Sequence, residues 1–451
     1  MVAKQRPSFS MPRVSPARSA AFDILLRVEQ EDSYASELLH ASPAAQLSAT
    51  DHGLATELVM GVLRWRSVLD SVIKSLSSSP IAKLDKEVLT ALRLGSYQLL
   101  FLDRVPARAA IHESVELVKR ARKRSAAPFV NAVLRKMSQG TFKSPPQQDD
   151  SPASIAQHYA HPEWLVSRWI KTYGSQPARE ICSYDQQIPR IAIRISDSAA
   201  EKELQQQGIQ LAPGELLSSA RRVLSGDITT TQAFREGRIS IQDEASQLVA
   251  LLVGHGRILD CCAAPGGKAA LIAARNPDSE IVALEVHPHR ARLLRKLVTA
   301  PNVRPVAADA RQMPISTKFD SVLVDSPCSG TGTLARNPEI KWRLRLEDLN
   351  QLQSLQLDIL RSSADRTEPG GRLVYSTCSL EREENEQVIE SFLAENASFQ
   401  ILPCSRQLEN LKSEGELAWE ATSALLSGAY LRTLPGVHPC DGFFAAVLTR
   451  T

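Results

Sequence analysis

Hydrophobic residues in the first third of the chain recur every three or four positions. The first repeat runs through Phe22, Leu25 and Leu26. Further repeats follow at Leu54, Leu58, Val59, Val62 and Leu63, at Val88, Leu89, Leu92 and Leu99, at Ile111, Val115 and Val118, and at Val130, Val133 and Leu134. This spacing places apolar side chains on one face of an α-helix, and prolines separate the repeats or stand at their beginnings. The pattern predicts an all-α domain over residues 16–138.

The helical pattern stops at residues 140–152, a polar stretch with three prolines that we interpret as a linker. After it, apolar residues between Trp164 and Ile170 have helical spacing, whereas Ile191–Ile195 alternates like a β-strand, and another short strand is expected around Val223. We therefore expect residues 1–150 to be the helical domain with its linker, and residues 151–238 to be a small α+β module.

From Gln242 onward, short apolar runs alternate with helical stretches. We expect β-strands at 257–262, 281–286, 304–308, 321–324 and 372–376, and helices between them, for example at 288–297 and 346–360. Such alternation predicts a parallel sheet with helices on both faces, and these sheets bind ligands at the carboxyl ends of their strands. Residues 239–451 are thus expected to form an α/β, Rossmann-like domain.

Composition and charge narrow the class of protein. Of the 451 residues, 43% are hydrophobic and 23% charged, as in a globular protein. No apolar run reaches the roughly 18 residues that a membrane span needs, and the basic N-terminus lacks a signal-type apolar stretch, so we expect a cytoplasmic protein with no membrane partner. Residues 1–150 carry 21 Lys and Arg against 15 Asp and Glu. The basic cluster Lys119, Arg120, Arg122, Lys123 and Arg124 could attract phosphates, although a solvated helix face explains it equally well.

Neither the cysteines nor the histidines show a metal-binding pattern, and we expect no metal. The seven cysteines form no C-x-x-C pair and no regular spacing, which argues against a zinc site or a disulfide framework and suits a reducing compartment. They are Cys182, Cys261, Cys262, Cys328, Cys378, Cys404 and Cys440. His158, His161, His287 and His289 match no metal motif and are expected to be surface or capping residues.

A small-residue turn after the first of these strands is the first candidate site. Residues 263–268 read AAPGGK and lead into an Ala-rich helix, so backbone N–H groups can approach a ligand closely. The turn is not a P-loop, because Ala269 follows the lysine and the upstream glycine is missing. The next two strands end at Glu285 and Asp309, acids suited to ribose hydroxyls and an adenine amino group. Each acid alone could simply cap a helix, but together with the turn they favour an adenosine cofactor.

Two cysteines follow the next strands. Cys328 lies in the run DSPCSGTG that begins at Asp325, and Cys378 lies in YSTCS. A single cysteine is often a buried, inert residue, but these two share Gly- and Ser-rich turns whose N–H donors can stabilise a thiolate. A thiolate that adds to carbon 6 of cytosine makes carbon 5 nucleophilic enough to accept a methyl group. Asp325, if protonated, can hydrogen-bond the N3 side of the base, and a second thiol has a task when the adduct is eliminated.

These residues resemble the NOL1/NOP2/Sun family of RNA cytosine-C5 methyltransferases. The matching segments are CCAAPGGK at 261–268, DSPCSGTG at 325–332, YSTCSL at 375–380, ISIQDEASQL at 239–248 and PGVHPCDGFFAAVL at 435–448. PFVNAVLRK at 128–136 and YAHPEWLVSRWIKTYG at 159–174 resemble a bacterial branch that joins a NusB-like RNA-binding domain to the catalytic region and methylates 16S ribosomal RNA. The resemblance implies a class I methyltransferase domain with a mostly parallel, seven-stranded sheet.

The resemblance also implies a role for each matching residue. Cys378 would be the nucleophile that forms an adduct with carbon 6 and Cys328 would assist elimination, with Lys268 and Asp325 near the base. S-adenosylmethionine would be bound by Cys262, Ala263, Ala264, Pro265, Gly266, Gly267, Lys268, Glu285, Asp309 and Asp325. Glu285 stands where Asp is common. In DNA cytosine-C5 methyltransferases a Pro-Cys cysteine of the Cys328 type attacks instead, so the choice of Cys378 follows from the resemblance of its STCS context.

Three alternatives remain open on the sequence. The chain could be a non-catalytic NusB-like RNA-binding factor, against which the intact Cys328, Cys378, Asp325 and glycine turn argue. It could methylate a different RNA cytosine. A DNA-directed enzyme is disfavoured because no segment resembles a DNA target-recognition domain. We expect a monomer whose partner is 16S rRNA, free or in an early small-subunit particle, with a target base that is flipped out or in a loop.

Overall fold

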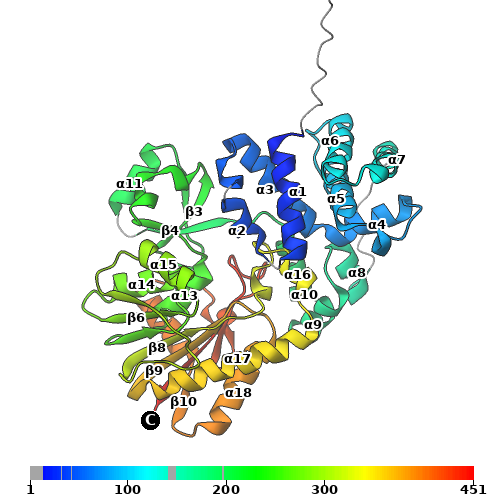
Figure 1. Ribbon diagram of the computed structural model, residues 1–451. Coiled ribbons are helices and arrows are strands. Elements are labelled where there is room, and N and C mark those ends of the chain that lie inside the picture. Colours follow the sequence, from blue (N-terminus) through cyan, green and yellow to red (C-terminus); the bar gives the residue numbers. More distant parts are fainter. Residues whose placement is uncertain (1–13, 32, 42, 141–148, 196–197) are drawn as a thin grey trace, which may run out of the picture. The chain divides into compact units, whose positions relative to one another are not determined.

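The computed structural model describes residues 14–31, 33–41, 43–140, 149–195 and 198–451 (Figure 1). It contains two compact units. One comprises the chain up to Ser175 together with Ala335–Trp342, and the other comprises Gln176–Leu334 and Arg343–Thr451. Most of the expected linker lies at 141–148, outside the described residues. The first unit extends beyond residue 150 and takes in a short segment from the second half of the chain.

The first unit is helical, as the periodicity predicts. Its α-helices are α1 (Pro16–Gln30), α2 (Ala35–His40), α3 (Ala49–Arg64), α4 (Arg66–Leu76), α5 (Lys86–Phe101), α6 (Ala107–Arg120), α7 (Ala127–Gln139), α8 (Pro152–His158) and α9 (Glu163–Tyr173). The apolar stripes converge on one core, in which Phe22, Leu58 and Leu92 are fully buried. Ser48 caps α3 by accepting a hydrogen bond from the backbone N–H of Asp51, which satisfies one of the free donors at the helix start.

The segment Ala335–Trp342 completes the end of α3. The last carbonyl groups of an α-helix have no partner within the helix. Here the indole Nε1 of Trp342 donates to the carbonyl of Leu63 at 2.6 Å, and the ammonium of Lys341 donates to the carbonyl of Arg64 at 3.1 Å. Arg64 in turn donates from Nη2 to the carbonyl of Ala335 at 3.1 Å. This segment, which follows the Cys328 motif in the chain, is therefore bound into the helical unit.

The second unit begins with a small α+β module, confirming the expected class. Its sheet is antiparallel with the order β2-β3-β1-β4. The elements are α10 (Ser175–Asp185), β1 (Ile191–Ile195), α11 (Ser198–Gln206), β2 (Gln210–Pro213), β3 (Ala220–Ser225), α12 (Gln232–Arg235) and β4 (Ile239–Ile241). Arginines of this module are held by glutamates: Arg221 by Glu201 at 2.6 Å and Arg238 by Glu203 at 2.6 Å.

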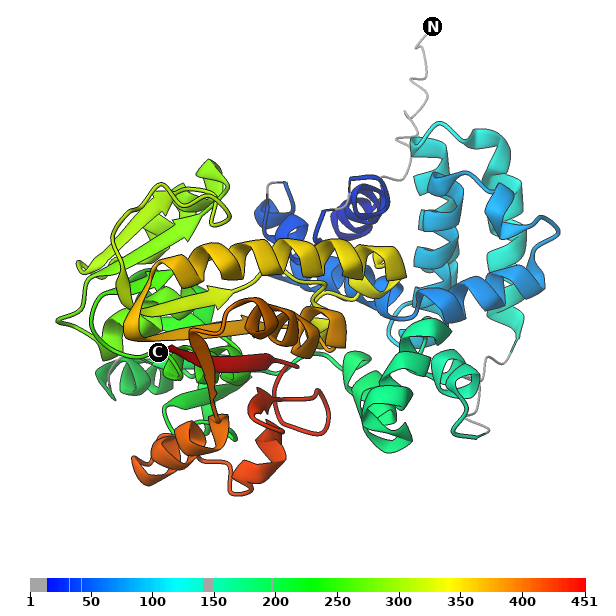
Figure 2. The same cartoon turned by 90° about the horizontal axis from the view of Figure 1, so that it is seen from below.

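The large sheet of the second unit has the order β11-β12-β13-β9-β8-β5-β6-β7, with β10 paired to β13. Its strands are β5 (Ile258–Asp260), β6 (Ile281–Glu285), β7 (Val303–Ala307), β8 (Phe319–Asp325), β9 (Thr367–Thr377), β10 (Phe399–Leu402), β11 (Leu426–Ser427), β12 (Tyr430–Arg432) and β13 (Phe444–Arg450). The five strands from β7 to β9 are parallel, and β13, seen in red in Figure 2, runs antiparallel to β9. In the described part of the chain the sheet thus has nine strands. The expectation of seven is corrected, because the short β11 and β12 extend the edge beyond β13.

Helices cover both faces of this sheet. The helices are α13 (Glu244–Leu251), α14 (Gly267–Arg275), α15 (Pro288–Leu297), α17 (Leu346–Asp365), α18 (Glu386–Glu395) and α19 (Cys404–Ser413). The short helix α16 (Ile340–Arg343) begins in the segment that belongs to the first unit. One core holds residues of α13, α14 and α19, and a second holds residues of α17 and α18. Helix α17 buries Ile359 and Leu360 but exposes Leu346. No helix in the described part of the chain is long and apolar enough to cross a membrane.

Candidate active site

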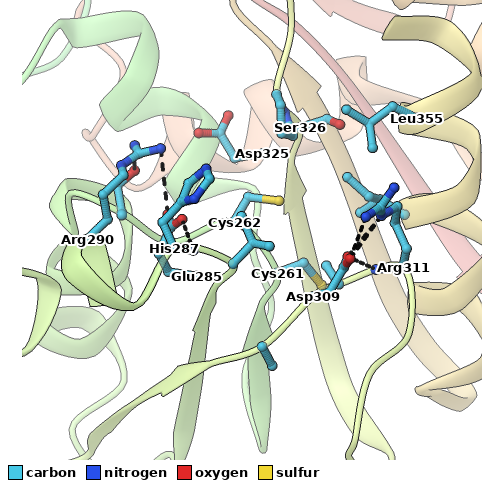
Figure 3. A pocket seen from close by; sticks show the side chains of 16 residues that line it. Cys261, Cys262, Glu285, His287, Arg290, Asp309, Arg311, Asp325, Ser326 and Leu355 are labelled. Carbon is cyan, nitrogen blue, oxygen red and sulfur yellow. Dashed lines mark hydrogen bonds and ion pairs between the residues drawn. The ribbon is translucent and has the colours of Figure 1, made fainter. Parts of the chain in front are cut away.

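A cavity of about 510 Å³ opens where the strand order reverses, between β5 and β8. Ligands of open α/β sheets bind in the crevice at this switch point. Figure 3 shows Glu285 and Asp309 on either side of Cys262, with Asp325 and Ser326 above them in this view. Leu355 and Ile359 of α17 contribute apolar side chains to its lining. The size is typical of a small-molecule site.

The two acids expected at strand ends both line this cavity, and both also bind local backbone. Glu285 is 5% exposed and accepts a hydrogen bond from the backbone N–H of His287 at 2.9 Å. Asp309 accepts from the backbone N–H of Arg311 at 2.9 Å and from its guanidinium at 2.6 Å. Hydrogen bonding by Arg311 lowers the pKa of Asp309, so this carboxylate is charged. His287, Arg290 and Arg311 are lining residues that the sequence reasoning missed, although each lies within five residues of a strand-end acid.

The glycine turn lies beside the cavity. Ala264 and Cys262 are among its lining residues, whereas Ala263, Pro265, Gly266, Gly267 and Lys268 are not. Gly266 has a φ of +121°, and a Cβ atom there would lie 2.4 Å from the side chain of Val298. Only glycine lets the turn adopt this backbone conformation while α15 packs against it. The turn therefore begins α14 and holds the loop close to the carboxyl end of β5.

Lys268 points toward Asp325 instead of toward the cavity. Its ammonium lies 2.7 Å from Asp325 Oδ2 and 5.1 Å from the centre of the Phe443 ring. The hydroxyl of Ser376 donates to the other oxygen of Asp325 at 2.8 Å. Burial by itself lowers the pKa of Lys268, but the charges of Asp325, Cys378 and Asp260 outweigh it, so the pKa is raised and the lysine stays protonated. Asp325 therefore both lines the cavity and forms the ion pair with Lys268.

Asp260 is a fully buried carboxyl group that interacts electrostatically with both members of this pair, and the sequence reasoning missed it. It is the last residue of β5, directly before the glycine-turn motif. Burial, and then repulsion by Asp325, raise its pKa to about 7, while Lys268 lowers it. Its position at a strand end before a small-residue turn is the signal that could have identified it.

The structure brings the two predicted thiols close together. Cys328 Sγ and Cys378 Sγ lie 3.4 Å apart, and both cysteines are partly exposed. The two turns approach closely because Gly332 donates from its backbone N–H to the carbonyl of Cys378 at 2.8 Å. A Cβ at Gly332 would lie 2.2 Å from the carbonyl oxygen of Gly442 and 2.8 Å from that of Cys378. The glycine of the Cys328 motif is therefore required by backbone packing.

Burial and hydrogen bonding raise the pKa of several of the cysteine thiols. The hydrogen bond with Cys378 and then burial raise the pKa of Cys328 well above its usual range. Burial also raises the pKa of Cys261 to about 12 and that of Cys404 to about 11. These thiols keep their protons at neutral pH. Cys378 is the cysteine that interacts electrostatically with the ammonium of Lys268.

Two minor expectations change. In the basic cluster, Lys119 is paired with Glu116 at 2.7 Å, Lys123 with Asp85 at 3.0 Å, and Arg120 with Asp23. The cluster is therefore less available to phosphates than its sequence suggests. His161 is buried, with 4% exposure, and packs edge-on against Trp169, so it is not a surface residue. Its Nδ1 lies 2.7 Å from the carbonyl oxygen of Tyr159, the C-cap residue of α8, which agrees with the capping role.

The sequence matches three family models in succession. Residues 15–139 match the NusB family, residues 161–226 the ferredoxin-like domain of RsmF/B-like methyltransferases, and residues 249–449 the model described as 16S rRNA methyltransferase RsmB/F. A probable ribosomal RNA small subunit methyltransferase B of Bacillus subtilis is 35% identical, with 95% of this chain and 97% of that protein covered. The chain belongs to the RsmB/F family of rRNA methyltransferases.

A second relative and a solved structure also match nearly the whole chain. The ribosomal RNA small subunit methyltransferase B of Vibrio cholerae is 30% identical, covering 98% of this chain and 99% of that protein. The crystal structure of PH0851 superposes with a TM-score of 0.78 at 25% identity, covering 97% of this chain and 99% of that one. This RsmB/F protein is an RNA methyltransferase that uses S-adenosylmethionine.

The cavity fits this cofactor. An adenosine needs an acceptor for its ribose hydroxyls and an apolar slot for its base, and Glu285 and Ile359 offer these within one cavity. Glu285 retains acceptor capacity, because its Oε1 accepts from His287 and its Oε2 lies 3.8 Å from Arg290. Ala264 adds a small side chain to the lining of the same cavity.

Proposed function

We propose that this protein methylates carbon 5 of one cytosine in 16S rRNA, with Cys378 as the covalent nucleophile. The observation that carries the proposal is the pair of thiols 3.4 Å apart at two neighbouring strand ends. Cys378 is beside the Lys268–Asp325 ion pair, and Asp325 also lines the cofactor cavity. A methyl donor in that cavity and a base over Cys378 would both be in reach of Asp325.

The first task of the site is to activate the base. The Cys378 thiolate adds to carbon 6 and forms an Sγ–C6 bond, while the C5=C6 electron pair shifts toward C4 and N3. Negative charge then grows at N3. Lys268 supplies a hydrogen-bond donor there, and Asp325 relays a proton. Carbon 5 then forms a bond to the methyl group that S-adenosylmethionine would supply, and the electron pair of the broken S–CH3 bond stays on the sulfur of the cofactor. Cys262, Ala264, Glu285 and Asp309 would hold the cofactor, with Asp325 at its reactive end.

The second task is to release the product. Once carbon 5 carries the methyl group, its proton leaves to a water molecule and the C5–H electron pair re-forms the C5=C6 bond. The Sγ–C6 bond breaks and its electron pair returns to Cys378. Cys328, which keeps its proton because of its raised pKa, donates a hydrogen bond to the departing thiolate. Cys328 therefore assists elimination, whereas Cys378 makes the bond.

We propose three domains for these tasks. Residues 1–150 would be the NusB-like RNA-binding domain and linker, residues 151–238 an RNA-recognition module, and residues 239–451 the methyltransferase domain. Recognition would rest on RNA shape and phosphate contacts, with the target base flipped out. The relatives from Bacillus subtilis and Vibrio cholerae are named as small subunit rRNA methyltransferases, which supports 16S rRNA as the substrate. We further propose a cytoplasmic monomer.

The test uses 16S rRNA that lacks modification. Wild-type protein should transfer a methyl group to one cytosine, read by bisulfite sequencing, and should form a denaturant-resistant adduct with RNA that contains 5-fluorocytidine. Cys378→Ala should abolish both signals, while Cys328→Ala should accumulate an adduct on ordinary RNA. If Cys378→Ala accumulates the adduct instead, the two roles are reversed. If the methylated cytosine lies in another RNA, the rRNA assignment is wrong while the chemistry stands.

A further inference from the structure

A buried carboxylate joins the two cysteine turns through hydrogen bonds. Glu384 is fully buried and lies in the short 3-10 helix Arg382–Glu384 that follows β9. Its Oε1 accepts a hydrogen bond from the backbone N–H of Ser329 at 2.7 Å, and its Oε2 accepts from the Ser329 hydroxyl at 2.5 Å. The same Oε2 accepts from the hydroxyl of Ser379 at 2.5 Å. Ser329 and Ser379 directly follow Cys328 and Cys378, so one carboxylate holds the residue after each thiol.

The attachment extends to the residue before Cys328. The side-chain amide of Gln356, on α17, donates to Glu384 Oε1 at 3.0 Å and to the carbonyl of Pro327 at 2.9 Å. Glu384 is itself fixed, because the hydroxyl of Tyr375 donates to its backbone carbonyl at 2.6 Å. Both sides of the Cys328 turn are therefore tied to the carboxylate or to the residue that binds it.

The carboxylate has donors but no cation. Within the described parts of the chain no Lys, Arg or His nitrogen forms an ion pair with Glu384. Burying a carboxylate that has hydrogen bonds but no ion-pair partner costs stability, and a neutral amide oxygen could accept the same N–H with less cost. The negative charge also acts on Cys328, where it is one of the causes that raise the pKa of that thiol. These facts favour a role in the reaction over a role in folding alone.

We propose that Glu384 is the positioning residue of the two thiols: it fixes the Cys328 turn against the Cys378 turn, so that Cys328 remains a protonated donor to the leaving Cys378 sulfur. The proposal rests on the cysteine roles proposed above. It assigns Glu384 to the release step, because adduct formation needs only Cys378, whereas elimination needs both sulfurs at hydrogen-bond distance. It gives no role to Glu384 in cofactor binding, since the cofactor cavity is lined by other residues.

The two conservative variants separate position from charge. Glu384→Gln keeps the length of the side chain but removes the charge, and its NH₂ group no longer accepts from a hydroxyl. Release of methylated RNA from the adduct should slow tenfold or more, with the KM for S-adenosylmethionine changed less than twofold. Because the charge of Glu384 raises the Cys328 pKa, the alkaline limb of the pH–rate profile should move to lower pH. Glu384→Asp keeps the charge, but its side chain is one methylene shorter and no longer reaches both turns. Release should therefore slow while the alkaline limb of the pH–rate profile stays in place.

Glu244→Gln is the matched control for folding. Glu244 is another buried carboxylate of the same unit. Among the residues that the structure describes, its hydrogen-bond donors are the backbone N–H groups of Glu215, Leu216 and Leu217. Glu244→Gln should leave the release rate and the pH profile of the folded protein unchanged. A folded Glu384→Gln protein with the wild-type release rate would refute the proposal. So would an equal loss in cofactor binding, adduct formation and release, because that pattern belongs to a general structural defect.

A double variant separates this proposal from the proposed function. If Glu384 acts through Cys328, adding Glu384→Gln to Cys328→Ala should not slow release further. An additive loss overturns the positioning role. Trapping of wild-type protein on 5-fluorocytidine RNA is scored first: if no adduct forms, the cysteine mechanism fails irrespective of Glu384. If the adduct forms and only the Glu384 variants behave as wild type, the cysteine mechanism stands and the positioning role fails.

Discussion

Asp260 makes the stability of the methyltransferase unit depend on pH in a direction that can be measured. The carboxyl group is fully buried, and its pKa of about 7 compares with an ordinary value of 3.8. A carboxyl group whose pKa is raised by folding stabilises the folded protein below its unfolded pKa, and this contribution is lost as pH rises toward the folded pKa. Between pH 4 and pH 7 the loss amounts to at most about 4 kcal/mol, at 1.36 kcal/mol per pH unit.

Asp260→Asn removes this titration while it keeps nearly the same shape. The stability of the variant relative to wild type should therefore increase from pH 5 to pH 7 and level off above pH 7. Urea unfolding of both proteins, without cofactor and followed by tryptophan fluorescence, measures the difference at each pH. Glu409→Gln is the control, because Glu409 is an exposed residue of α19 and solvent screens its charge. A difference between Asp260→Asn and wild type that stays constant from pH 5 to pH 8 would contradict the assigned cause.

Three further predictions follow from single contacts. Gly332→Ala should abolish methylation and lower the midpoint of unfolding, because its Cβ would overlap backbone carbonyl oxygens of two neighbouring turns; activity near the wild-type level would disprove this packing. Trp342→Phe removes the donor to the Leu63 carbonyl, so the helical unit should lose about 1 kcal/mol in denaturant unfolding, and unchanged stability would show that water replaces the bond. Alanine at Arg122 and Arg124 should weaken RNA binding and reduce its dependence on salt concentration. Alanine at Lys119, Arg120 and Lys123, which are held in ion pairs, should have a smaller effect. Equal effects of the two sets of variants would contradict the importance of pairing.

Local structure was largely predictable because its causes are local. The helix expected at 288–297 has those bounds in the structure, and the strand expected at 281–286 ends one residue earlier. Apolar periodicity and proline positions depend on neighbouring residues alone. The same holds for the glycine turn before α14, whose conformation demands residues without a side chain. The expected number of strands in the large sheet was wrong. Strands of two or three residues, such as β11 and β12, are too short to show an alternation of apolar and polar residues.

The residues of the candidate site were named from the sequence, but their distances were not. The register between strands β8 and β9 decides these distances. Asp325 stands opposite Ser376, Cys328 follows Asp325 by three residues, and Cys378 follows Ser376 by two residues. That register depends on the packing of both faces of the sheet. It brings together thiols that are 50 residues apart in the chain.

The sequence by itself thus determined the order of elements, the glycine turn and the presence of two cysteines at strand ends. The tertiary structure decided that Lys268 pairs with Asp325, that Asp260 is buried, and that Glu384 holds both cysteine turns. The reason is physical: a periodic pattern reports which face of an element is apolar, whereas burial of a charge and the approach of two turns arise only when distant segments pack.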